Sequence, residues 1–360
     1  MNSSRVLQTE FASNSDFFAN IVGRNELELI SSEEIMNFFG SSRILIIGAG
    51  GTIGSAVARR LLNSGIKNVY FLDRDESALH ALALGLSHEA ASHSDLCIVA
   101  DIKDLNGLNE VFAKYKPDIV IHAAALKHLV IVERFPREGY ITNVVGTRNV
   151  LEAAKVNGIS QVVNISTDKA ANPTSILGKT KRITELLVEE YNKQSEVTCC
   201  SVRFGNVFAS RGSVIETFVH QISNKLPVTL TDLDVTRYFM SHDEAANLIL
   251  ASAMNKSEGV FVQNMGQEIL VSEIVHRLAT HLGESYSTKI IGLQPGEKLH
   301  EELYAGAYEK TSIPEIVKVE IPSNLDLVKM VEAIGSPEDN KHALEIIDQL
   351  LENSDTKIVK

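Results

Sequence analysis

Short apolar segments alternate with longer amphipathic ones from residue 43 to residue 203. The apolar segments are rich in Val and Ile and comprise Arg43–Gly48, Asn68–Asp73, Leu96–Ala100, Asp118–Ala123, Gln161–Ser166 and Val197–Arg203. The amphipathic segments have helical apolar spacing and comprise Thr52–Ser64, Glu76–Ala91, Leu105–Tyr115, Arg137–Val156 and Lys179–Gln194. Strands that alternate with helices form a parallel sheet with helices on both faces. The pattern therefore predicts an α/β fold with a doubly wound parallel sheet.

A glycine-rich turn links the first predicted strand to the first predicted helix. Gly48, Gly51 and Gly54 follow a Gly-x-x-Gly-x-x-Gly spacing, since Ile53 breaks the Gly-x-Gly-x-x-Gly spacing of ordinary dehydrogenases. Such a turn lets the backbone and the N-terminus of the following helix, here at Thr52, approach a pyrophosphate. A glycine-rich turn without a ligand is the alternative. The context favours a Rossmann-type nucleotide-binding domain.

Residues after the next three strands extend this predicted cofactor site. Asp73 ends the second strand, where its carboxylate can accept hydrogen bonds from the adenosine ribose and repel a 2′-phosphate. Arg74 could instead pair with that phosphate, so we expect NAD, with NADP as the alternative. Asp101-Ile102 could flank the adenine or cap the helix from Leu105. The small side chains of Ala123-Ala124 allow close passage of a cofactor, although ordinary packing explains them equally well.

The rest of the chain divides into further parts. We expect a helical N-terminal extension over residues 1–40, because Ser31–Glu34 has the pattern of a helix start. Residues 41–204 form the predicted Rossmann domain. Polar turns interrupt the pattern after Gly205, which predicts a smaller α/β substrate-binding region over 205–335, with some segments returning to the first domain. Residues 336–360 form a predicted helical tail that contains an amphipathic helix over Lys341–Leu351.

Composition argues against several kinds of partner. A formal net charge of −12 and the absence of Trp in 360 residues argue against nucleic acid or an anionic membrane as a ligand. Three cysteines cannot form a disulfide framework, and the adjacent Cys199 and Cys200 are typical of buried thiols in a reducing compartment. Met1–Asn14 lacks the apolar core of a signal peptide, and no apolar stretch reaches the about 18 residues of a membrane helix. We expect a soluble, cytoplasmic protein.

An acid and a base stand side by side directly after the fifth predicted strand. Thr167, Asp168 and Lys169 follow that strand, at the sheet edge where such folds bind ligands. Lys181 lies where a short-chain dehydrogenase keeps the lysine of its Tyr-x-x-x-Lys pair, but Leu177 occupies the tyrosine position. A solvated Asp-Lys turn is the plain alternative. The missing phenol indicates that proton transfers use other groups.

The ordered motifs resemble an extended short-chain dehydrogenase/reductase of the polysaccharide-biosynthesis type, the UDP-N-acetylglucosamine 4,6-dehydratases. The matching segments span roughly residues 20 to 305 and are Gly48–Gly54, His122–His128, Thr142–Val144, Gly146-Thr147, Ser166–Lys169, Asn172–Thr174, Lys181-Arg182, Arg203–Val207, Ser210–Ile215, Thr236–Met240 and Gln294–Leu299. Small members that invert C5 keep the tyrosine, whereas larger membrane-anchored members carry Met there, and Leu177 sides with the latter. Ile21–Asn25 also resembles the region preceding their catalytic domain. The resemblance implies a soluble relative that retains the configuration at C5.

The resemblance also implies a mechanism, a net dehydration of UDP-N-acetylglucosamine. Oxidation at C4 acidifies the hydrogen on C5, a base removes it while an acid helps the C6 hydroxyl leave, and the hydride returns to C6. Lys169 would be the base and Asp168 the acid, each with its pKa shifted toward neutrality. Thr167 would bond the C4 oxygen, and Lys181 the nicotinamide ribose. The acceptor of the C4 hydroxyl proton stays open among Asp168, a water chain and Thr167 backed by Lys181.

Five side chains are candidates for holding the sugar nucleotide. Asn206 could hydrogen-bond the diphosphate, while Arg211 and Arg237 could neutralise it in bidentate fashion. Lys127 could approach the sugar or the phosphates, and Glu297 the uridine end. Structural ion pairs are the alternative for both arginines. The histidines lack metal-ligand companions, so we expect no metal. Because members of the family are commonly oligomeric, the resemblance also implies a homo-oligomer.

Other functions stay open on the same scaffold. A nucleotide-sugar 4-epimerase needs C4 oxidation and re-reduction but no acid–base pair at C5 and C6, so Asp168-Lys169 counts against it. A C5-inverting dehydratase differs only in the fate of the C5 proton. A catalytically idle NAD-binding regulator gains weight from Leu177 in place of the tyrosine.

Overall fold

The computed structural model describes residues 15–86, 94–304, 306–321 and 327–355. Within these ranges, nine strands form one sheet in the order β14-β15-β11-β6-β5-β4-β1-β2-β3. Their bounds are β1 Ile44–Ile47, β2 Val69–Asp73, β3 Cys97–Val99, β4 Ile119–His122, β5 Gln161–Ile165, β6 Thr198–Arg203, β11 Gly259–Gln263, β14 Tyr308–Lys310 and β15 Ile316–Val319. The strands from β3 to β11 run parallel, and β15 and β14 are antiparallel additions. All six predicted strands are present, and the order 3-2-1-4-5-6 is that of doubly wound dinucleotide-binding sheets.

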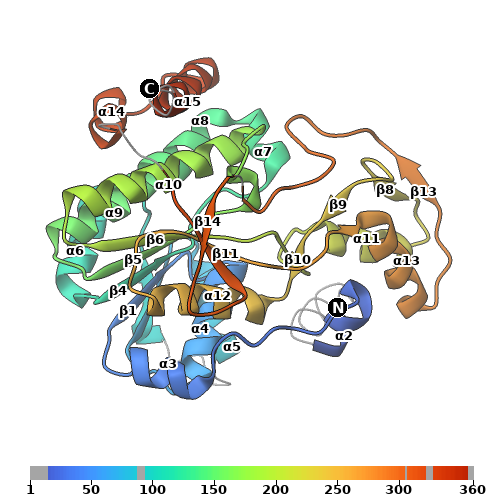
Figure 1. Ribbon diagram of the computed structural model, residues 1–360, viewed down its shortest axis with the longest axis horizontal. Helices are drawn as coiled ribbons and strands as arrows, with labels where there is room; N and C mark the ends of the chain where they lie inside the picture. Colours follow the sequence, from blue (N-terminus) through green and yellow to red (C-terminus); the bar gives the residue numbers. More distant parts are fainter. Residues whose placement is uncertain (1–14, 87–93, 305, 322–326, 356–360) are drawn as a thin grey trace.

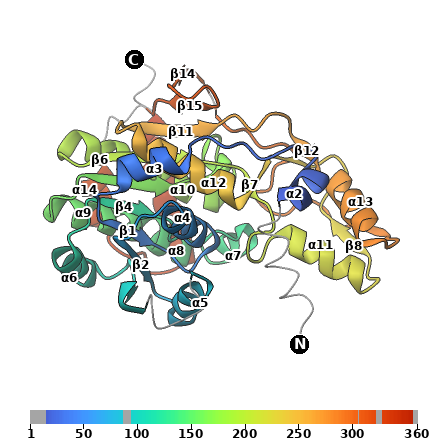
Figure 2. The ribbon, with the colours of Figure 1, turned by 90° about the horizontal axis from the view of Figure 1, so that it is seen from below.

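Helices cover both faces of this sheet (Figures 1 and 2). One face carries α4 (Thr52–Asn63), α5 (Glu76–Leu86) and α12 (His242–Met254), and the other carries α6 (Leu105–Tyr115), α9 (Gly146–Val156) and α10 (Ile176–Gln194). The predicted fold class is therefore confirmed. α3 (Ser32–Phe39) starts where the sequence predicts, because Ser31 and Glu34 form a reciprocal capping box.

Three predicted helices have different bounds in the structure. α10 begins three residues early, at Ile176, because the Ser175 hydroxyl accepts a hydrogen bond from the Gly178 amide at 3.0 Å. The segment Arg137–Val156 divides into α8 (Pro136–Gly139), a π-helical turn (Tyr140–Val145) and α9. Such π-turns frequently mark functional sites. The helix predicted over Glu76–Ala91 is described as α5 up to Leu86, and residues 87–91 lie outside the described residues.

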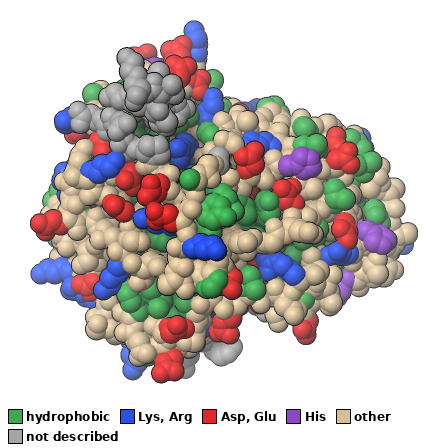
Figure 3. Space-filling view, in the orientation of Figure 1, with side chains coloured by type: hydrophobic (Ala, Val, Ile, Leu, Met, Phe, Trp, Pro, Cys, Tyr) green, Lys and Arg blue, Asp and Glu red, His purple; other side chains and the backbone are tan. Residues whose placement is uncertain are grey.

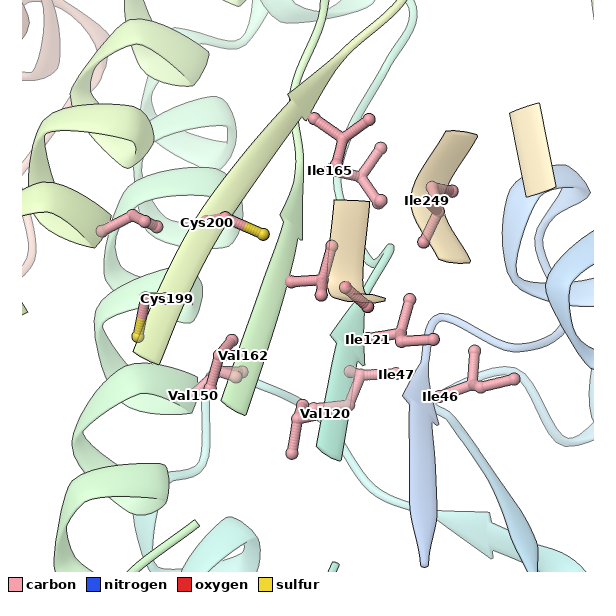
Figure 4. Packing of buried hydrophobic residues seen from close by; sticks show 14 of the residues in the cluster. Ile46, Ile47, Val120, Ile121, Val150, Val162, Ile165, Cys199, Cys200 and Ile249 are labelled. Carbon is pink, nitrogen blue, oxygen red and sulfur yellow. The ribbon is translucent and has the colours of Figure 1, made fainter. Parts of the chain in front are cut away.

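The interior of the sheet is apolar and closely packed (Figure 4). Ile46 and Ile47 on β1 lie beside Val120 and Ile121 on β4, and all four are fully buried. Neighbouring strand residues point to opposite faces, so each strand of a sheet covered on both sides is apolar throughout. On β6, the sulfur atoms of Cys199 and Cys200 lie on opposite sides of the strand, and both thiols are free and buried. Burial raises the pKa of Cys200 to about 12, which makes it unreactive.

A second apolar cluster lies apart from the sheet. It joins α2 (Ser15–Val22) to α11 (Val214–Ser223), β8 (Val228–Leu230) and α13 (Val271–Leu282), which lie together at one end of the molecule (Figures 1 and 2). Shorter elements complete the chain: α7 Leu129–Arg134, β7 Asn206–Val207, β9 Thr236–Arg237, β10 Phe239–Met240, β12 Ile269–Leu270 and β13 Thr288–Ile290. Among the described residues these short strands pair as β7 with β10, β9 with β12 and β8 with β13.

Two C-terminal helices pack outside the sheet layers. α14 (Leu327–Ile334) and α15 (Asn340–Asp355) lie over α10 and α8 (Figure 1). Lys179 on α10 pairs with Asp348 on α15 at 2.6 Å. α15 includes the predicted helix Lys341–Leu351. Among the described helices, none is both long and apolar enough to cross a bilayer.

Candidate active site

The glycine-rich turn of the sequence lies at the carboxyl end of β1 and opens a cleft. Gly48 has a φ of +81°, and a Cβ at this position would lie 2.6 Å from the backbone nitrogen of Ala124. A Cβ at Gly54 would collide with the carbonyl of Gly48, so this glycine allows helix and turn to pack closely. Gly51 precedes α4 without a side-chain cap, so no side chain takes up the first amides of the helix. Thr52 and Ile53 begin α4, with Ile53 packed against the core.

The cleft has a volume of about 140 Å³ and is lined by residues at the ends of four parallel strands. Asp73 at the end of β2 accepts hydrogen bonds from the Gly50 amide on Oδ2 and the Asp75 amide on Oδ1, both at 3.0 Å. Arg74 and Asp101 also line it, with Arg74 Nη1 4.0 Å from Asp101 Oδ2. The structure thus brings the predicted ribose-binding carboxylate beside the glycine turn.

Asp101 does not cap α6. Asp104 does so instead, by accepting a hydrogen bond from the Gly107 amide at 3.1 Å. The helix-cap alternative for Asp101 is therefore wrong, because the cap lies directly before Leu105. The neighbouring Ile102 lines the cleft and is otherwise buried in the core.

The π-helical turn supports the far wall of the cleft. Ala123 and Ala124 follow β4 and line the cleft, as does Thr142 of the π-turn. The side chain of Asn143 accepts a hydrogen bond from the Leu126 amide at 2.8 Å and donates one to the Leu126 carbonyl at 3.1 Å. Asn143 thereby fixes the loop after β4. The sequence motif around Thr142 singled out this segment but did not predict its π geometry.

The residues Thr167, Asp168 and Lys169, hereafter the acid–base turn, follow the carboxyl end of β5 directly. Asp168 Oδ1 accepts hydrogen bonds from the Thr167 hydroxyl and the Lys169 amide at 2.8 Å each, and from Lys169 Nζ at 3.1 Å. Asp168 is 1% exposed, and its Oδ2 is buried without a hydrogen-bond partner among the described residues. The alternative of a solvated Asp-Lys turn is therefore wrong.

Glu301 is a functional candidate that sequence reasoning missed. Its Oε1 lies 3.3 Å from Lys169 Nζ, and the residue is 2% exposed. The turn before it packs on the start of α10, where Thr174 donates to the Gly296 carbonyl at 3.2 Å. The available signal was its position just beyond the Gln294–Leu299 motif.

The pKa of Lys169 is shifted away from neutrality, opposite to the direction expected from the sequence. Burial alone would lower its pKa, but the carboxylates of Asp168 and Glu301 act more strongly, and the net shift is upward. Lys169 is therefore an ammonium in this state rather than the free amine that a base requires. The expectation of a pKa shifted toward neutrality missed the second carboxylate.

Lys181 lies on α10 one turn after Leu177, and both side chains are buried. Burial lowers the pKa of Lys181 to about 8, although the Glu185 carboxylate opposes the shift. Glu185 in turn accepts hydrogen bonds from Arg203 and Ser166. Lys181 is thus a buried cation close to its neutral form at physiological pH.

A loop of the second part of the fold reaches the glycine turn. The Arg211 amide donates to the Thr52 hydroxyl at 3.2 Å, and Lys127 Nζ donates to the Arg211 carbonyl at 2.9 Å. Two predicted substrate residues therefore lie together at the N-terminus of α4, with the Arg211 side chain exposed. Asn206 lies on β7, half-buried, and its backbone amide bonds the Tyr238 carbonyl.

Arg237 and Glu297 contact each other. Arg237 Nη2 lies 2.8 Å from Glu297 Oε1, and its Nη1 donates to two backbone carbonyls. Glu297 also accepts hydrogen bonds from the Thr231 hydroxyl and the Gln294 amide. The ion-pair alternative considered for Arg237 is what the structure contains. Arg237 lies close enough to lower the pKa of both Lys169 and Glu301.

Acidic and basic side chains are interspersed over the face in Figure 3, with hydrophobic side chains gathered near its middle. Within the described ranges, no group of three His, Cys, Asp or Glu side chains is arranged to hold a metal ion. Burial lowers the pKa of His122 to about 3, so this ring is neutral.

Comparison with known proteins agrees with the motifs and the fold. Residues 44–321 match the family model described as polysaccharide biosynthesis protein. The chain belongs to this family. The matched residues include the glycine turn, the acid–base turn and Glu301, so every element of the candidate site lies inside the family region. The resemblance to polysaccharide-biosynthesis members of the extended short-chain dehydrogenase/reductases is thereby confirmed.

Individual family relatives carry different names. The chain is 37% identical over 289 residues to the probable polysaccharide biosynthesis protein EpsC of Bacillus subtilis, which covers 79% of this chain. It is 38% identical over 292 residues to the capsular polysaccharide biosynthesis protein CapD of Staphylococcus aureus, again covering 79% of this chain. The chain spans about half the length of these two relatives, 48% of each. A protein of Rickettsia canadensis named UDP-glucose 4-epimerase is 33% identical, with 74% of this chain and 78% of that protein covered.

Solved structures share the fold of the family member described here. Pen from Bacillus thuringiensis matches with a TM-score of 0.72 and 32% identity, over 80% of this chain and 90% of Pen. UDP-glucose 4-epimerase of Thermus thermophilus, solved with NAD, matches with a TM-score of 0.65 at 21% identity, over 86% and 99% of the two chains. The latter likeness concerns the fold alone.

Proposed function

We propose that the chain is a nucleotide-sugar 4,6-dehydratase, a hydro-lyase that uses NAD. The proposed substrate is UDP-N-acetylglucosamine, and the product is UDP-2-acetamido-2,6-dideoxy-hexos-4-ulose. The observation that carries the proposal is the buried Asp168–Lys169 contact at the carboxyl end of β5. Elimination of water needs an acid and a base close together, and this contact supplies both. The family description and the names of EpsC and CapD support a role in the synthesis of bacterial surface polysaccharide.

NAD fits the cleft at the end of β1. The missing side chain of Gly48 leaves room beside Ala124, and the uncapped amides of α4 would hold the pyrophosphate. Asp73 would accept hydrogen bonds from the adenosine ribose, and its charge disfavours the 2′-phosphate of NADP. Arg74, the candidate partner of that phosphate, lies within reach of Asp101. When bound, NAD supplies a reversible hydride acceptor for C4 that can return the hydride to C6.

The chain's own residues handle the protons and the hydroxyl groups. Asp168 donates a proton to the leaving C6 hydroxyl, and the Lys169 amine takes the proton from C5. The Thr167 hydroxyl bonds the C4 oxygen, and Lys181 holds the nicotinamide ribose and provides positive charge. Lys169 must first lose a proton, because its two carboxylate neighbours hold it as an ammonium.

The stereochemistry at C5 is assigned from Leu177. This apolar side chain occupies the place of the phenol that C5-inverting members keep, so we propose retention at C5. Because Leu177 cannot accept a proton, the acceptor of the C4 hydroxyl proton is Asp168, a water chain or Thr167 backed by Lys181.

The sugar nucleotide would lie between the two parts of the fold. Lys127 and the backbone of Arg211 lie at the N-terminus of α4, where the two cationic side chains could neutralise a diphosphate. Asn206 could hydrogen-bond the same group. Arg237 would need to leave Glu297, or share it, before contacting the substrate. Assembly into a homo-oligomer remains part of the proposal.

A second candidate is a nucleotide-sugar 4-epimerase, favoured by the names of the Rickettsia relatives. An epimerase has no use for an acid and a base at C5 and C6, and the buried Asp168–Lys169 contact speaks against it. Incubation with UDP-N-acetylglucosamine separates the two by mass. Loss of one water from the sugar nucleotide supports dehydration, and an unchanged mass with a changed C4 configuration supports epimerisation.

A catalytically idle NAD-binding regulator is the third possibility. It would bind NAD and yield no product from the sugar nucleotide. Substitutions at Asp168 or Lys169 would then leave its behaviour intact, whereas in a dehydratase they strongly lower turnover.

A further inference from the structure

Lys169 lies between two buried carboxyl groups that come from distant parts of the chain. Its Nζ is 3.1 Å from Asp168 Oδ1 and 3.3 Å from Glu301 Oε1. Asp168 is 1% exposed and Glu301 2%, so water stabilises neither charge. With both carboxyls ionised, one ammonium would leave a net negative charge in the interior.

Arg237 does not balance this charge. It acts on both Lys169 and Glu301, but its guanidinium is paired with Glu297 at 2.8 Å. The groups that act on Glu301 are thus Lys169, Asp168 and a neutralised Arg237. The cluster of Asp168, Lys169 and Glu301 is therefore electrically neutral only when it holds two protons.

Two carboxyl oxygens without hydrogen-bond partners also indicate that the cluster holds two protons. Asp168 Oδ2 and Glu301 Oε2 are both buried and accept no hydrogen bond within the described structure. A buried ionised oxygen without a donor is unfavourable, and a proton on the carboxyl group relieves it. Burial raises the pKa of Glu301, Lys169 offsets part of that rise, and Asp168 adds to it.

We propose that Glu301 is a positioning residue that takes the proton of Lys169 and so frees the amine to act as a base. This inference rests on the proposed dehydratase function. In the transfer, an N–H bond of the ammonium breaks and an O–H bond forms on Glu301, with no change in oxidation state. The cluster then holds a protonated Asp168, a neutral Lys169 and a protonated Glu301. Its total charge is zero before and after the transfer.

The protons released and taken up in one turnover balance. Asp168 gives its proton to the leaving C6 hydroxyl as water, and Lys169 takes the C5 proton and later returns a proton to C5. The proton released when the C4 hydroxyl is oxidised is held by the water chain or by Thr167 backed by Lys181, and it replaces the proton of Asp168 after that residue has protonated the leaving group. Glu301 keeps its proton throughout, because its task is complete once Lys169 is neutral.

The test compares Glu301→Gln with the neighbouring Glu302→Gln in the full chain. Glu302 is exposed and contacts Asn172, so its amide variant controls for the substitution itself. The first readout needs no substrate. The infrared carbonyl absorption of protonated carboxyl groups should be weaker in Glu301→Gln, where only Asp168 of the cluster can contribute to it, and unchanged in Glu302→Gln.

The second readout is kinetic. With UDP-N-acetylglucosamine, Glu301→Gln should lower kcat about 100-fold with KM unchanged, because the amide cannot accept the proton. Solvent deuterium should enter C5 about 100-fold more slowly. Glu301→Asp keeps a carboxyl group and should restore part of the rate, which also guards against a variant that fails to fold.

The outcomes separate the two proposals. A wild-type rate of deuterium entry in Glu301→Gln, or an infrared carbonyl absorption that this substitution leaves undiminished, overturns the role of Glu301. Absence of any product with the wild-type protein overturns the dehydratase function, and the infrared band alone then decides whether Glu301 holds the proton.

Discussion

Arg203 and Glu185 form a buried two-pronged ion pair beneath the acid–base turn. The distances from Arg203 Nε to Glu185 Oε1 and from Nη2 to Oε2 are both 2.6 Å. Ser166 donates to the same Glu185 Oε1 at 2.6 Å, and it directly precedes Thr167. The pair therefore anchors the end of β5, from which Asp168 and Lys169 project.

Removal of one partner of this pair should destabilise the fold strongly. Glu185→Gln leaves the Arg203 charge buried and uncompensated, so the free energy of unfolding should fall by about 3–5 kcal/mol. Urea denaturation measures the loss. Glu189→Gln, which removes the partner of a more exposed lysine, should change stability by at most about 1 kcal/mol. Equal unfolding midpoints for Glu185→Gln and the wild type would refute the anchoring role.

The same pair gives a pH dependence of stability. Burial raises the pKa of Glu185, but Arg203, Arg182 and Ser166 together lower it by more, so the folded-state value lies below the ordinary one. The stabilisation is therefore complete above the unfolded-state pKa and is lost as pH falls through the folded-state pKa. The stability difference between wild type and Glu185→Gln should accordingly shrink in acid. A stability difference that grows as pH falls would contradict the lowered pKa of Glu185.

The acid–base turn should be essential for turnover and dispensable for cofactor binding. Asp168→Asn and Lys169→Ala should each lower kcat by about 100-fold to 10,000-fold, the usual contribution of general acid–base catalysis. NAD affinity, followed by fluorescence or calorimetry, should stay within a few-fold of wild type because the cleft is lined by other residues. Lys179→Ala, whose lysine pairs with Asp348 outside the cluster, serves as the control. Turnover at the wild-type rate in both acid–base variants would refute the catalytic role of the acid–base turn.

Lys181 should set an alkaline limit to activity. Burial lowers its pKa to about 8, and only its charged form provides the proposed positive charge. In the free enzyme, kcat/KM should therefore decline as pH rises through about 8. Lys181→Arg keeps its charge at every accessible pH and should lose this decline. An identical alkaline limb in that variant would assign the titration to another group.

Gly48 should be intolerant of a side chain for a reason beyond its dihedral angle. Gly48→Ala places a Cβ 2.6 Å from the Ala124 nitrogen, so it should lower both stability and NAD affinity. Gly158→Ala is the matched control, because its φ of +64° is also left-handed but no atom lies within 4 Å of the added Cβ. The control should cost about 1–2 kcal/mol of strain and leave NAD affinity unchanged. Equal effects of the two substitutions on NAD binding would place the cofactor elsewhere.

The sequence predicted best those features that depend on neighbouring residues, such as apolar periodicity and helix caps. Strand and helix periodicity predicted each of the first six strands of the sheet, since buried parallel strands are apolar throughout. The capping box at Ser31 likewise marked the start of α3. The start of α10 was placed late because the cap residue Ser175 precedes the first amphipathic repeat.

Contacts between distant segments were beyond the reach of the sequence. Glu301 contacts Lys169 because the segment around Gly296 packs against the start of α10. No local sequence pattern predicts this contact between distant residues. Arg237 and Glu297 were predicted as separate ligand contacts for the same reason, although they pair with each other. The π-helical turn around Asn143 is also a tertiary effect, because its sequence reads as an ordinary helix.

The most direct test of the proposed dehydration follows a single hydrogen. Substrate UDP-N-acetylglucosamine carrying deuterium at C4 should yield a product lighter by one water, with that deuterium at C6 and no net consumption of NAD. Retention of the sugar's full mass, or deuterium that remains at C4, would contradict dehydration by this chain.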